Sequence, residues 1–310
     1  MRIADKMTGV DKFVSFEFFP PKEREKWDDF FHEARRLREV NPLFVSVTYG
    51  AGGTTQDNTL EIVKKLKNEI GLEPMAHLTC VGADEKAIGE FLDQLAENDV
   101  NNVLALRGDP PKGEKSFIPS DARFCHANDL VDFIKERHPE MGVGVAGYPE
   151  VHPEAESAMS DLEALKVKIQ AGSDLIVTQL FFDNALYFDY ATKVKAMGVM
   201  QPIIPGILPV LSLASVERIV ELCGASIPED FLESLKAAHE EDKAAKEEGE
   251  PGGRVRALGI AHAKKQVAEL LEGGAPGVHL YTLNKADACL EIVRSPEVCK
   301  HLKDCAEPVA

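Results

Sequence analysis

Short apolar runs alternate with longer amphipathic stretches along this chain, eight times over. The runs are rich in Val, Ile, Leu and Phe, as is typical of strands that are buried on both faces. They predict strands at residues 13–18, 44–48, 74–79, 103–107, 143–147, 175–178, 203–207 and 278–281.

The stretches between these runs have the spacing of helices. Within residues 56–70, for example, Leu60, Val63 and Leu66 recur on one helical face, while Glu61 and Lys64 fall on the other. Patterns of this kind predict helices at residues 25–40, 56–70, 87–97, 128–137, 155–171 and 254–272.

Regular alternation of strands and helices implies parallel strands joined by right-handed crossovers. Eight such units in 310 residues favour an α/β fold of the (β/α)8 TIM barrel type, with residues 1–310 forming one catalytic domain. An open doubly wound sheet is the alternative, because periodicity alone does not show closure. Residues 208–277 are too many for one crossover, so we expect extra helices between strands 7 and 8. The charged run at 239–250 would be a solvated helix face.

Composition excludes several classes of partner. The formal net charge of −17 argues against a general nucleic-acid binder, which would present a basic face. No apolar run approaches the roughly 20 residues that cross a bilayer, and the first residues lack the features of a signal peptide. We therefore expect a cytoplasmic protein without a membrane partner. The six cysteines form no C-x-x-C pair, so the spacing predicts no metal.

Polar residues at the carboxyl ends of barrel strands indicate function, because a buried strand has no structural need for them. The first strand carries Glu17 between Phe16 and Phe18, with Phe19 following. Aromatic surroundings would favour the neutral carboxyl that a general acid requires. The alternative is a carboxylate that faces solvent or pairs with an arginine on the rim.

Further candidates follow other strands. The glycine-rich turn at residues 50–53 is able to present backbone N–H groups to a phosphate, or is only a tight turn. His77 suits a hydrogen-bonding role better than metal ligation, since no H-E-x-x-H motif accompanies it. Arg107 and Asp109 would place a guanidinium and a carboxylate at the mouth, and Gln179 suits a flat heterocycle.

These segments, in this order, resemble the methylenetetrahydrofolate reductases. The matching stretches are FEFFPP, SVTYGAGGTT, HLTC, LRGD, YPEVHPEA, TQLFFD, PGILPV and YTLNK, from residue 16 to 285. The resemblance implies a non-covalent FAD that NADH or NADPH reduces and 5,10-methylenetetrahydrofolate reoxidises, giving 5-methyltetrahydrofolate. It implies an oxidoreductase of one-carbon metabolism that feeds methionine synthesis. It also implies a homo-oligomer of catalytic barrels, without the regulatory domain of the larger eukaryotic members.

Matching motif positions imply residue roles. Glu17 would protonate the folate nitrogen that leaves as the five-membered ring opens, and Asp109 would be the second catalytic residue, near flavin and pterin. Gln179 and Lys285 would contact folate. The residues that would line the FAD site are Thr48, Tyr49, Ala51, His77, Arg107, Gly108, Asp109, Ala127, Tyr148, His152, Ala155, Asp161 and Lys168.

Two departures and two alternatives qualify the resemblance. Lys285 stands where relatives commonly carry Arg, which would weaken bidentate contact with folate. Residues 211–219 match poorly, so the resemblance does not decide which nicotinamide and folate contacts this segment makes. A pterin-binding methyltransferase on a similar barrel, or a flavin subunit that a partner protein reduces, are the competing functions. The sequence does not decide between NADH and NADPH.

Overall fold

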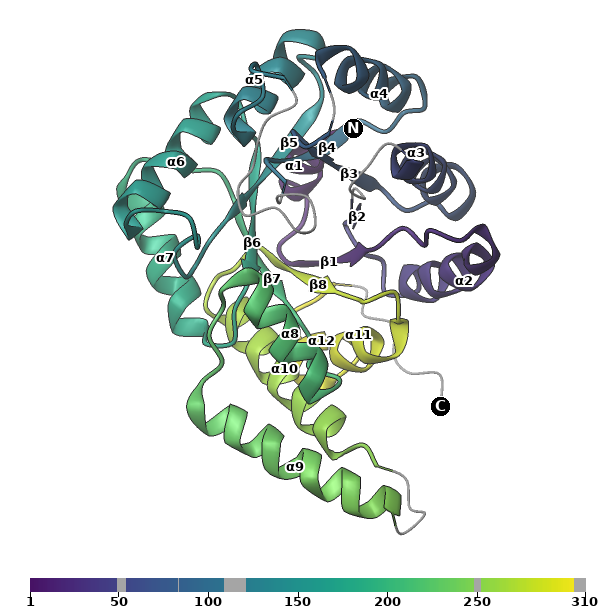
Figure 1. Ribbon diagram of the computed structural model, residues 1–310, viewed down its shortest axis with the longest axis vertical. Coiled ribbons are helices and arrows are strands. Elements are labelled where there is room, and N and C mark those ends of the chain that lie inside the picture. The colour runs from purple at the N-terminus through teal and green to yellow at the C-terminus, as the bar shows by residue number, and fades with distance from the viewer. Residues whose placement is uncertain (49–53, 83, 109–120, 248–251, 304–310) are drawn as a thin grey trace.

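Eight parallel strands close into a barrel in chain order, with helices around the outside (Figure 1). The computed structural model describes residues 1–48, 54–82, 84–108, 121–247 and 252–303. The strands are β1 (Phe13–Phe18), β2 (Phe44–Val47), β3 (Pro74–Thr79), β4 (Asn102–Leu106), β5 (Gly142–Gly147), β6 (Leu175–Leu180), β7 (Ile203–Ile207) and β8 (Gly277–Tyr281). The predicted (β/α)8 barrel is confirmed, and pairing of β1 with β8 excludes an open sheet.

Helices follow the strands and bury their apolar faces against them. In chain order they are α1 (Ile3–Met7), the 3-10 turn η1 (Arg24–Lys26), α2 (Trp27–Arg38), α3 (Thr54–Lys65), the π-helical turn η2 (Leu66–Ile70), α4 (Glu85–Glu97), α5 (Ala127–Arg137), α6 (Ala158–Gln170), α7 (Asn184–Ala196), α8 (Leu213–Cys223), α9 (Glu229–Glu247), α10 (Arg254–Glu272), α11 (Ala286–Val293) and α12 (Pro296–Cys299). Within the described ranges, none of these helices is both long and apolar enough to cross a membrane.

Most predicted elements lie within a few residues of the observed ones. The helix predicted at 155–171 begins later, at Ala158, because the Ser157 side chain accepts from the Ser160 N–H at 3.1 Å and caps it. The preceding Ala155 instead closes a turn, donating its N–H to the His152 carbonyl at 2.9 Å.

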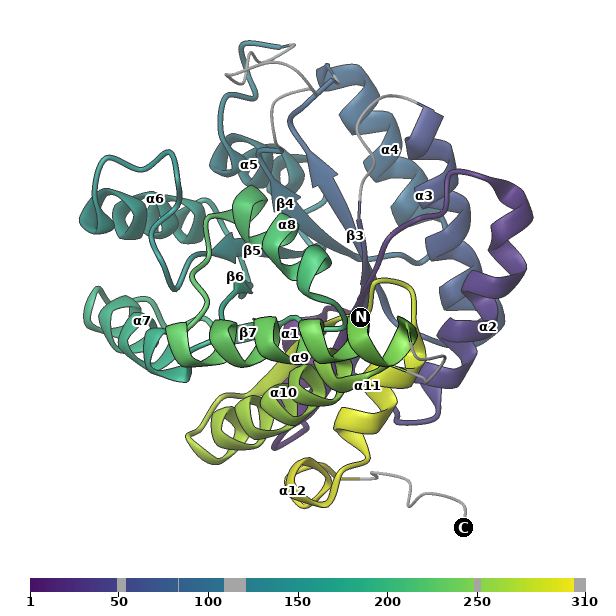
Figure 2. The ribbon, with the colours of Figure 1, turned by 60° about the horizontal axis from the view of Figure 1, so that its bottom comes forward.

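The extra helices predicted between β7 and β8 are α8, α9 and α10. Helix α9 runs beside α10 and extends away from the barrel (Figure 1). A second hydrophobic cluster joins these helices to the barrel, with Leu180 at the end of β6 and Phe182 just after it contributing beside Leu235 of α9 and Val255 of α10. Figure 2 shows α9 beside α10.

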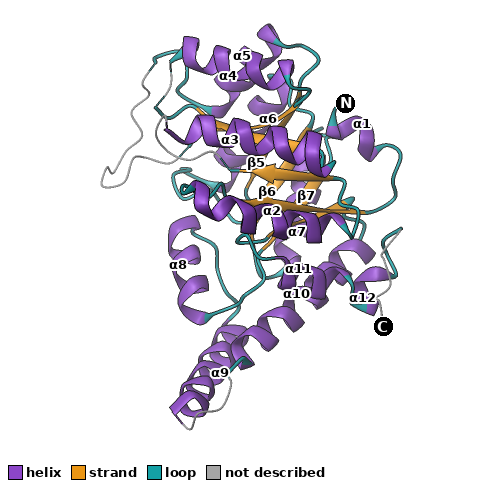
Figure 3. Ribbon diagram, turned by 90° about the vertical axis from the view of Figure 1, so that its right-hand side faces the viewer, coloured by secondary structure: helices purple, strands orange, loops and turns teal. Residues whose placement is uncertain are grey.

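Helix α1 closes the amino-terminal end of the barrel, a feature that the sequence pattern did not predict. Figure 3 shows α1 and α8 at opposite ends of the strands. The side chain of Ile3 is 1% exposed, and its N–H donates to Oδ1 of Asn102 at 2.8 Å. Lys6 pairs with the buried Glu73 at 2.8 Å. The open end is therefore the carboxyl end of the strands, where barrels carry their sites.

Candidate active site

The inside of the barrel changes from apolar to polar along the strands. Its lower layer is a cluster of apolar side chains from successive strands: Phe13, Phe44, Met75, Leu104, Leu175, Val177 and Ile204. One pleat further along, β1 and β8 place Ser15 beside His279, and β1 and β2 place Glu17 beside Ser46. A core packed for stability alone would be apolar here, so this upper layer is a candidate site.

Five side chains, Ser15, Glu17, Ser46, His77 and His279, form what we call the interior polar cluster; each is at most 7% exposed. Oε2 of Glu17 lies 3.4 Å from Oγ of Ser46, 3.5 Å from Nε2 of His77 and 3.7 Å from Nε2 of His279. His279 is held on both sides, by Ser15 at 2.8 Å and Ser46 at 3.0 Å. The cluster fixes one carboxyl group at the mouth of the barrel.

The hydrogen bonds of this cluster connect Glu17 to His279 through the Ser46 hydroxyl. Ser15 donates to the Val278 carbonyl at 3.1 Å, so it accepts from Nδ1–H of His279. Oγ of Ser46 lies within hydrogen-bond distance of both Nε2 of His279 and Oε2 of Glu17, and it is placed to donate to the carboxyl. The arrangement thus links a carboxyl and an imidazole through one hydroxyl, a set of groups suited to acid–base chemistry.

The expectation that Glu17 lies among phenylalanine rings is wrong. Successive side chains of a strand point to opposite faces, so Phe16 and Phe18 project outward. Both belong to the core between strands and helices, where the Phe18 ring lies 5.3 Å from that of Phe30. Glu17 is instead surrounded by hydroxyl and imidazole groups, and burial inside the barrel rather than aromatic packing excludes water.

Burial of His77 lowers its pKa to about 4, although the Glu17 charge opposes this shift. Its Nε2 has no hydrogen-bond partner within the described residues. The ring is therefore neutral near pH 7 and presents one unsatisfied polar atom toward the mouth. An orphaned buried nitrogen of this kind is typical of a site completed by a ligand.

Tyr281 connects the interior polar cluster to the far side of the mouth. Its hydroxyl donates to the Thr178 carbonyl of β6 at 3.1 Å, passing over β7. Gly206 permits this crossing, because a Cβ there would lie 2.8 Å from the Tyr281 hydroxyl. Desolvation, reinforced by the charges of Glu17 and Tyr148, raises the pKa of Tyr281, so the phenol stays protonated.

A second group of polar residues lies at the ends of β4 and β5. Arg107 pairs with Glu154 through Nη2 and Oε1 at 2.9 Å, which lowers the pKa of that carboxyl. The rings of Tyr148 and His152 meet edge to face, with centroids 4.6 Å apart. Burial, reinforced by the charge of Arg107, lowers the pKa of His152.

Lys168 and Asp161, both on α6, complete this second group. The partly buried Lys168 ammonium donates to the Ala146 carbonyl at 2.6 Å, and burial lowers its pKa to about 8. Asp161 accepts from the His152 N–H at 3.2 Å, and burial raises its pKa. We call Arg107, Tyr148, His152, Asp161 and Lys168 the α6 cluster.

Of the residues predicted for a cofactor, the structure brings Arg107, Tyr148, His152, Asp161 and Lys168 together in the α6 cluster and places His77 in the interior polar cluster. Thr48 directly follows β2, Gly108 follows β4 with φ +87°, and Ala127 begins α5. Ala155 lies in the turn between His152 and the start of α6. Tyr49, Ala51 and Asp109 lie outside the described residues.

The two remaining residues predicted to bind substrate differ in placement. Gln179 is partly buried in β6, where its Oε1 accepts from the Leu180 N–H at 2.9 Å. Lys285 is exposed and precedes α11. The poorly matching segment 211–219 contains the start of α8, which the Ser212 side chain caps.

Some residues of the interior polar cluster were not singled out from the sequence. Ser15, Ser46 and His279 had no assigned role, although each is a polar residue within an apolar strand. Counting back from Glu17 in steps of two would have identified Ser15, because alternate residues face the interior. Nothing local in the sequence identifies His279 as its partner.

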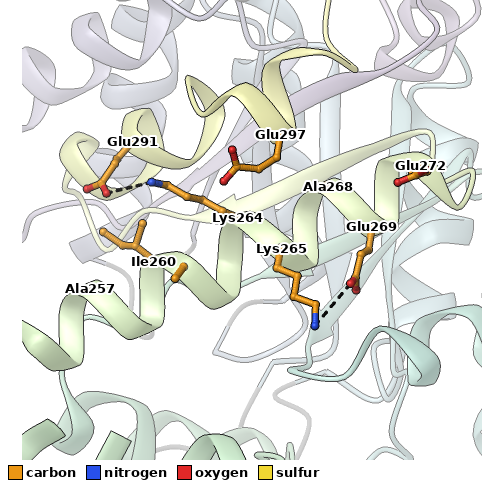
Figure 4. A pocket seen from close by; sticks show the side chains of 10 residues that line it. Ala257, Ile260, Lys264, Lys265, Ala268, Glu269, Glu272, Glu291 and Glu297 are labelled. Atoms are coloured by element: carbon orange, nitrogen blue, oxygen red, sulfur yellow. Dashed lines mark hydrogen bonds and ion pairs between the residues drawn. The ribbon is translucent and has the colours of Figure 1, made fainter. Parts of the chain in front are cut away.

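A surface groove along α10, α11 and α12 is a separate feature (Figure 4). Ion pairs cross or flank it, Lys264 with Glu291 at 3.2 Å and Lys265 with Glu269 at 3.8 Å. It belongs to the outer helices and contains none of the predicted site residues. Among the residues that the structure describes, no group of three or more His, Cys, Asp or Glu side chains is placed to hold a metal.

Comparison with known proteins identifies relatives of the chain. The family model for methylenetetrahydrofolate reductase matches residues 2–297. The chain is 37% identical over 307 residues to methylenetetrahydrofolate reductase (NADH) 1 of Arabidopsis thaliana, covering 94% of this chain and 50% of that protein. It is 35% identical over 274 residues to 5,10-methylenetetrahydrofolate reductase of Escherichia coli (strain K12), covering 88% and 87%.

The chain spans about half the length of the plant relatives it matches and most of the length of the bacterial ones. A solved structure of an uncharacterized protein from Clostridium thermocellum, described as binding two copies of 5-methyl-5,6,7,8-tetrahydrofolic acid, has the same fold. Its TM-score is 0.63 at 15% identity, covering 94% of this chain and 96% of that one. The match over residues 2–297 is decisive, and the chain belongs to the methylenetetrahydrofolate reductase family.

Proposed function

We propose that this chain binds FAD and reduces 5,10-methylenetetrahydrofolate to 5-methyltetrahydrofolate with electrons from NADH or NADPH. The observation that carries the proposal is the placement of Glu17, a carboxyl group 7% exposed at the barrel mouth and linked to His279 through the Ser46 hydroxyl. The plant relatives have NADH in their names, so NADH is the first donor to test.

The α6 cluster fits the diphosphate of FAD. An ammonium has three N–H donors, and within the described residues Lys168 uses one of them, toward Ala146. Its partial burial makes the unused donors effective toward an anion. Arg107 would add a guanidinium, in competition with Glu154, whose side chain is 52% exposed and able to turn away. The edge of Tyr148 and the unpaired Nε2 of His77 are further contacts for a flat cofactor.

When bound, FAD would supply a hydride acceptor and donor between nicotinamide and folate. The chain's own contribution is acid–base chemistry and positioning. Glu17 would give a proton to the folate nitrogen that leaves as the ring opens, and His279 with Ser46 would orient the carboxyl and restore its proton. The Gln179 amide would bind the pterin after releasing its bond to the Leu180 N–H.

A visible spectrum of the purified protein, followed by anaerobic titration with each nucleotide, tests the proposal. We expect a yellow protein that releases FAD on denaturation, is bleached by NADH or NADPH, and regains its colour with 5,10-methylenetetrahydrofolate. A protein that stays colourless after incubation with FAD would contradict the proposal and favour a methyltransferase. A flavin that neither nucleotide bleaches would indicate reduction by a partner protein.

A further inference from the structure

Side chains continue the pairing of β1 and β8 beyond the ends of both strands. Thr282 donates to the Glu17 carbonyl twice, from Oγ1 at 2.6 Å and from its N–H at 3.2 Å. Asn284 then acts as an additional strand residue toward Phe19. Its Oδ1 accepts from the Phe19 N–H at 2.9 Å, and its Nδ2 donates to the Phe19 carbonyl at 2.6 Å.

The turn that presents Asn284 is strained. Leu283 has φ 50° and Asn284 φ 58°, in a turn closed by the bond from the Lys285 N–H to the Thr282 carbonyl at 3.0 Å. Asn tolerates the left-handed region, whereas a Leu there is uncommon. Consecutive residues in this conformation persist only when their surroundings hold them, and they concentrate at functional sites. Here Thr282 bonds to Glu17 of β1, and Asn284 bonds to Phe19, the residue after β1.

What the turn holds in place is an exposed aromatic residue. Phe19 is 41% exposed, while Phe16 and Phe18 of the same segment are fully buried. Because strand residues alternate, Phe19 falls on the face of Ser15 and Glu17, one pleat above the carboxyl. Because the Phe19 ring is exposed, it contributes little to packing of the core. The two bonds that fix the Phe19 backbone therefore serve no evident packing role.

We propose that the Phe19 ring contacts the flat ring system of the folate above Glu17, and that Asn284 is a positioning residue for it. This inference rests on the proposed function. An aromatic ring is a good partner for a planar heterocycle, in offset or edge contact. A ring at this height would also cover the Glu17 carboxyl from water while the substrate is bound.

The test measures flavin reoxidation by 5,10-methylenetetrahydrofolate in stopped flow, after reduction by NADH. Phe19→Leu keeps an apolar side chain and loses the aromatic face. We expect the half-saturating folate concentration to rise about threefold to tenfold, with little change in the limiting rate or in bleaching by NADH. This result would mean that Phe19→Leu weakens folate binding in the ground state and in the transition state by the same amount. Met200→Ala is the control, since Met200 is 73% exposed and lies before β7, at the opposite end of the barrel.

Asn284→Gly separates positioning from contact, because glycine adopts the left-handed conformation but makes neither bond to Phe19. We expect it to raise the half-saturating concentration, and the double variant with Phe19→Leu to be no worse than Phe19→Leu alone. Additive effects would overturn the role of Asn284. Unchanged folate saturation in Phe19→Leu would overturn the contact while leaving the proposed function intact. A wild-type protein with no flavin reduction would instead overturn the proposed function.

Discussion

Nε2 of His77 lies 3.5 Å from Oε2 of Glu17, and neither the distance nor the burial of the ring makes this an ordinary ion pair. Desolvation, the largest influence, lowers the pKa of His77 to about 4, so the imidazole is neutral where the protein functions. His77 therefore contributes a neutral polar surface, and not a positive charge, beside the Glu17 carboxyl.

The depressed pKa of His77 predicts acid sensitivity. An unfolded histidine titrates near its ordinary value of about 6.5, so as pH falls from there toward about 4 the unfolded chain takes up a proton that the folded chain does not. Stability is fully present above pH 6.5 and is lost across this window, by an amount on the order of 3 kcal/mol. Urea unfolding at pH 7.5 and pH 4.5 measures the loss.

His77→Gln should lose clearly less stability between these two pH values than the wild type. His32→Gln is the control, because His32 is an exposed histidine on α2. The same loss in wild type and His77→Gln would show that other groups account for the acid sensitivity.

The ion pair between Lys6 of α1 and Glu73 lies far from the site, and we expect its loss to have a large effect on stability. Burial alone would raise the pKa of Glu73, but hydrogen bonds from Lys6 and Lys67 outweigh it and hold it below its usual range. Glu73→Gln should lower the free energy of unfolding by about 2 kcal/mol, since it leaves two partly buried ammonium groups without their carboxylate. Glu61→Gln is the matched control, because this carboxylate also meets two cations, but on the surface.

For that surface group we expect a loss below about 1 kcal/mol. Both values come from denaturant unfolding. Equal losses for the two variants would contradict a special role of Glu73 in closing the barrel.

The packing of α10 against the segment after β7 predicts that one Gly→Ala substitution lowers stability, contrary to its usual effect in a helix. In a helix, Gly→Ala ordinarily stabilises by about 1 kcal/mol. At Gly259, however, a Cβ would lie 1.9 Å from the Val210 carbonyl oxygen. Gly259→Ala should therefore destabilise, by about 2 kcal/mol. The control is Gly89→Ala in α4, where the nearest atoms are those of the flexible Arg137 side chain at 3.1 Å. A stabilised Gly259→Ala variant would show that α10 shifts freely.

Much of the fold was predictable because it depends on local pattern. Eight apolar runs and their intervening amphipathic stretches are sufficient to predict a barrel, and the strand ends to predict where chemistry lies. The neighbours of Glu17 were not predictable in the same way. Sequence neighbours suggested Phe16 and Phe18, whereas the pleat and closure of the barrel bring in His279, more than 260 residues later. Helix α1 was missed because five residues show no helical period.

Lys168 gives the proposed FAD site a pH dependence. Burial lowers the pKa of its ammonium to about 8, opposed by Asp161, so the charge that would meet the diphosphate is lost as pH rises through that value. If the charged form alone binds, FAD affinity should fall about tenfold between pH 7 and pH 9. Quenching of flavin fluorescence measures it. Lys168→Met should bind weakly at both values, while Lys166→Met on the same helix should behave as wild type. Tight binding by Lys168→Met would exclude this lysine from the site.

Glu17→Gln separates the two half-reactions of the proposed enzyme. Nicotinamide reduces flavin without a proton on folate, so bleaching by NADH should be largely intact in the variant. Opening of the folate ring needs a proton on the departing nitrogen, and an amide has none to give. Because general acid catalysis typically contributes about 10²–10⁴-fold, reoxidation by 5,10-methylenetetrahydrofolate should slow by at least about 100-fold.

Stopped-flow absorbance of each half-reaction in both proteins is the measurement. The amide preserves the size of Glu17 and its bond to Ser46, so the barrel interior should remain packed and FAD content unchanged. Slowing of both half-reactions to the same degree would indicate a displaced flavin and not a missing acid. If folate reoxidation kept its wild-type rate, the proton would have to come from another group. His279, which is linked to Glu17 through the Ser46 hydroxyl, would then be the next residue to replace.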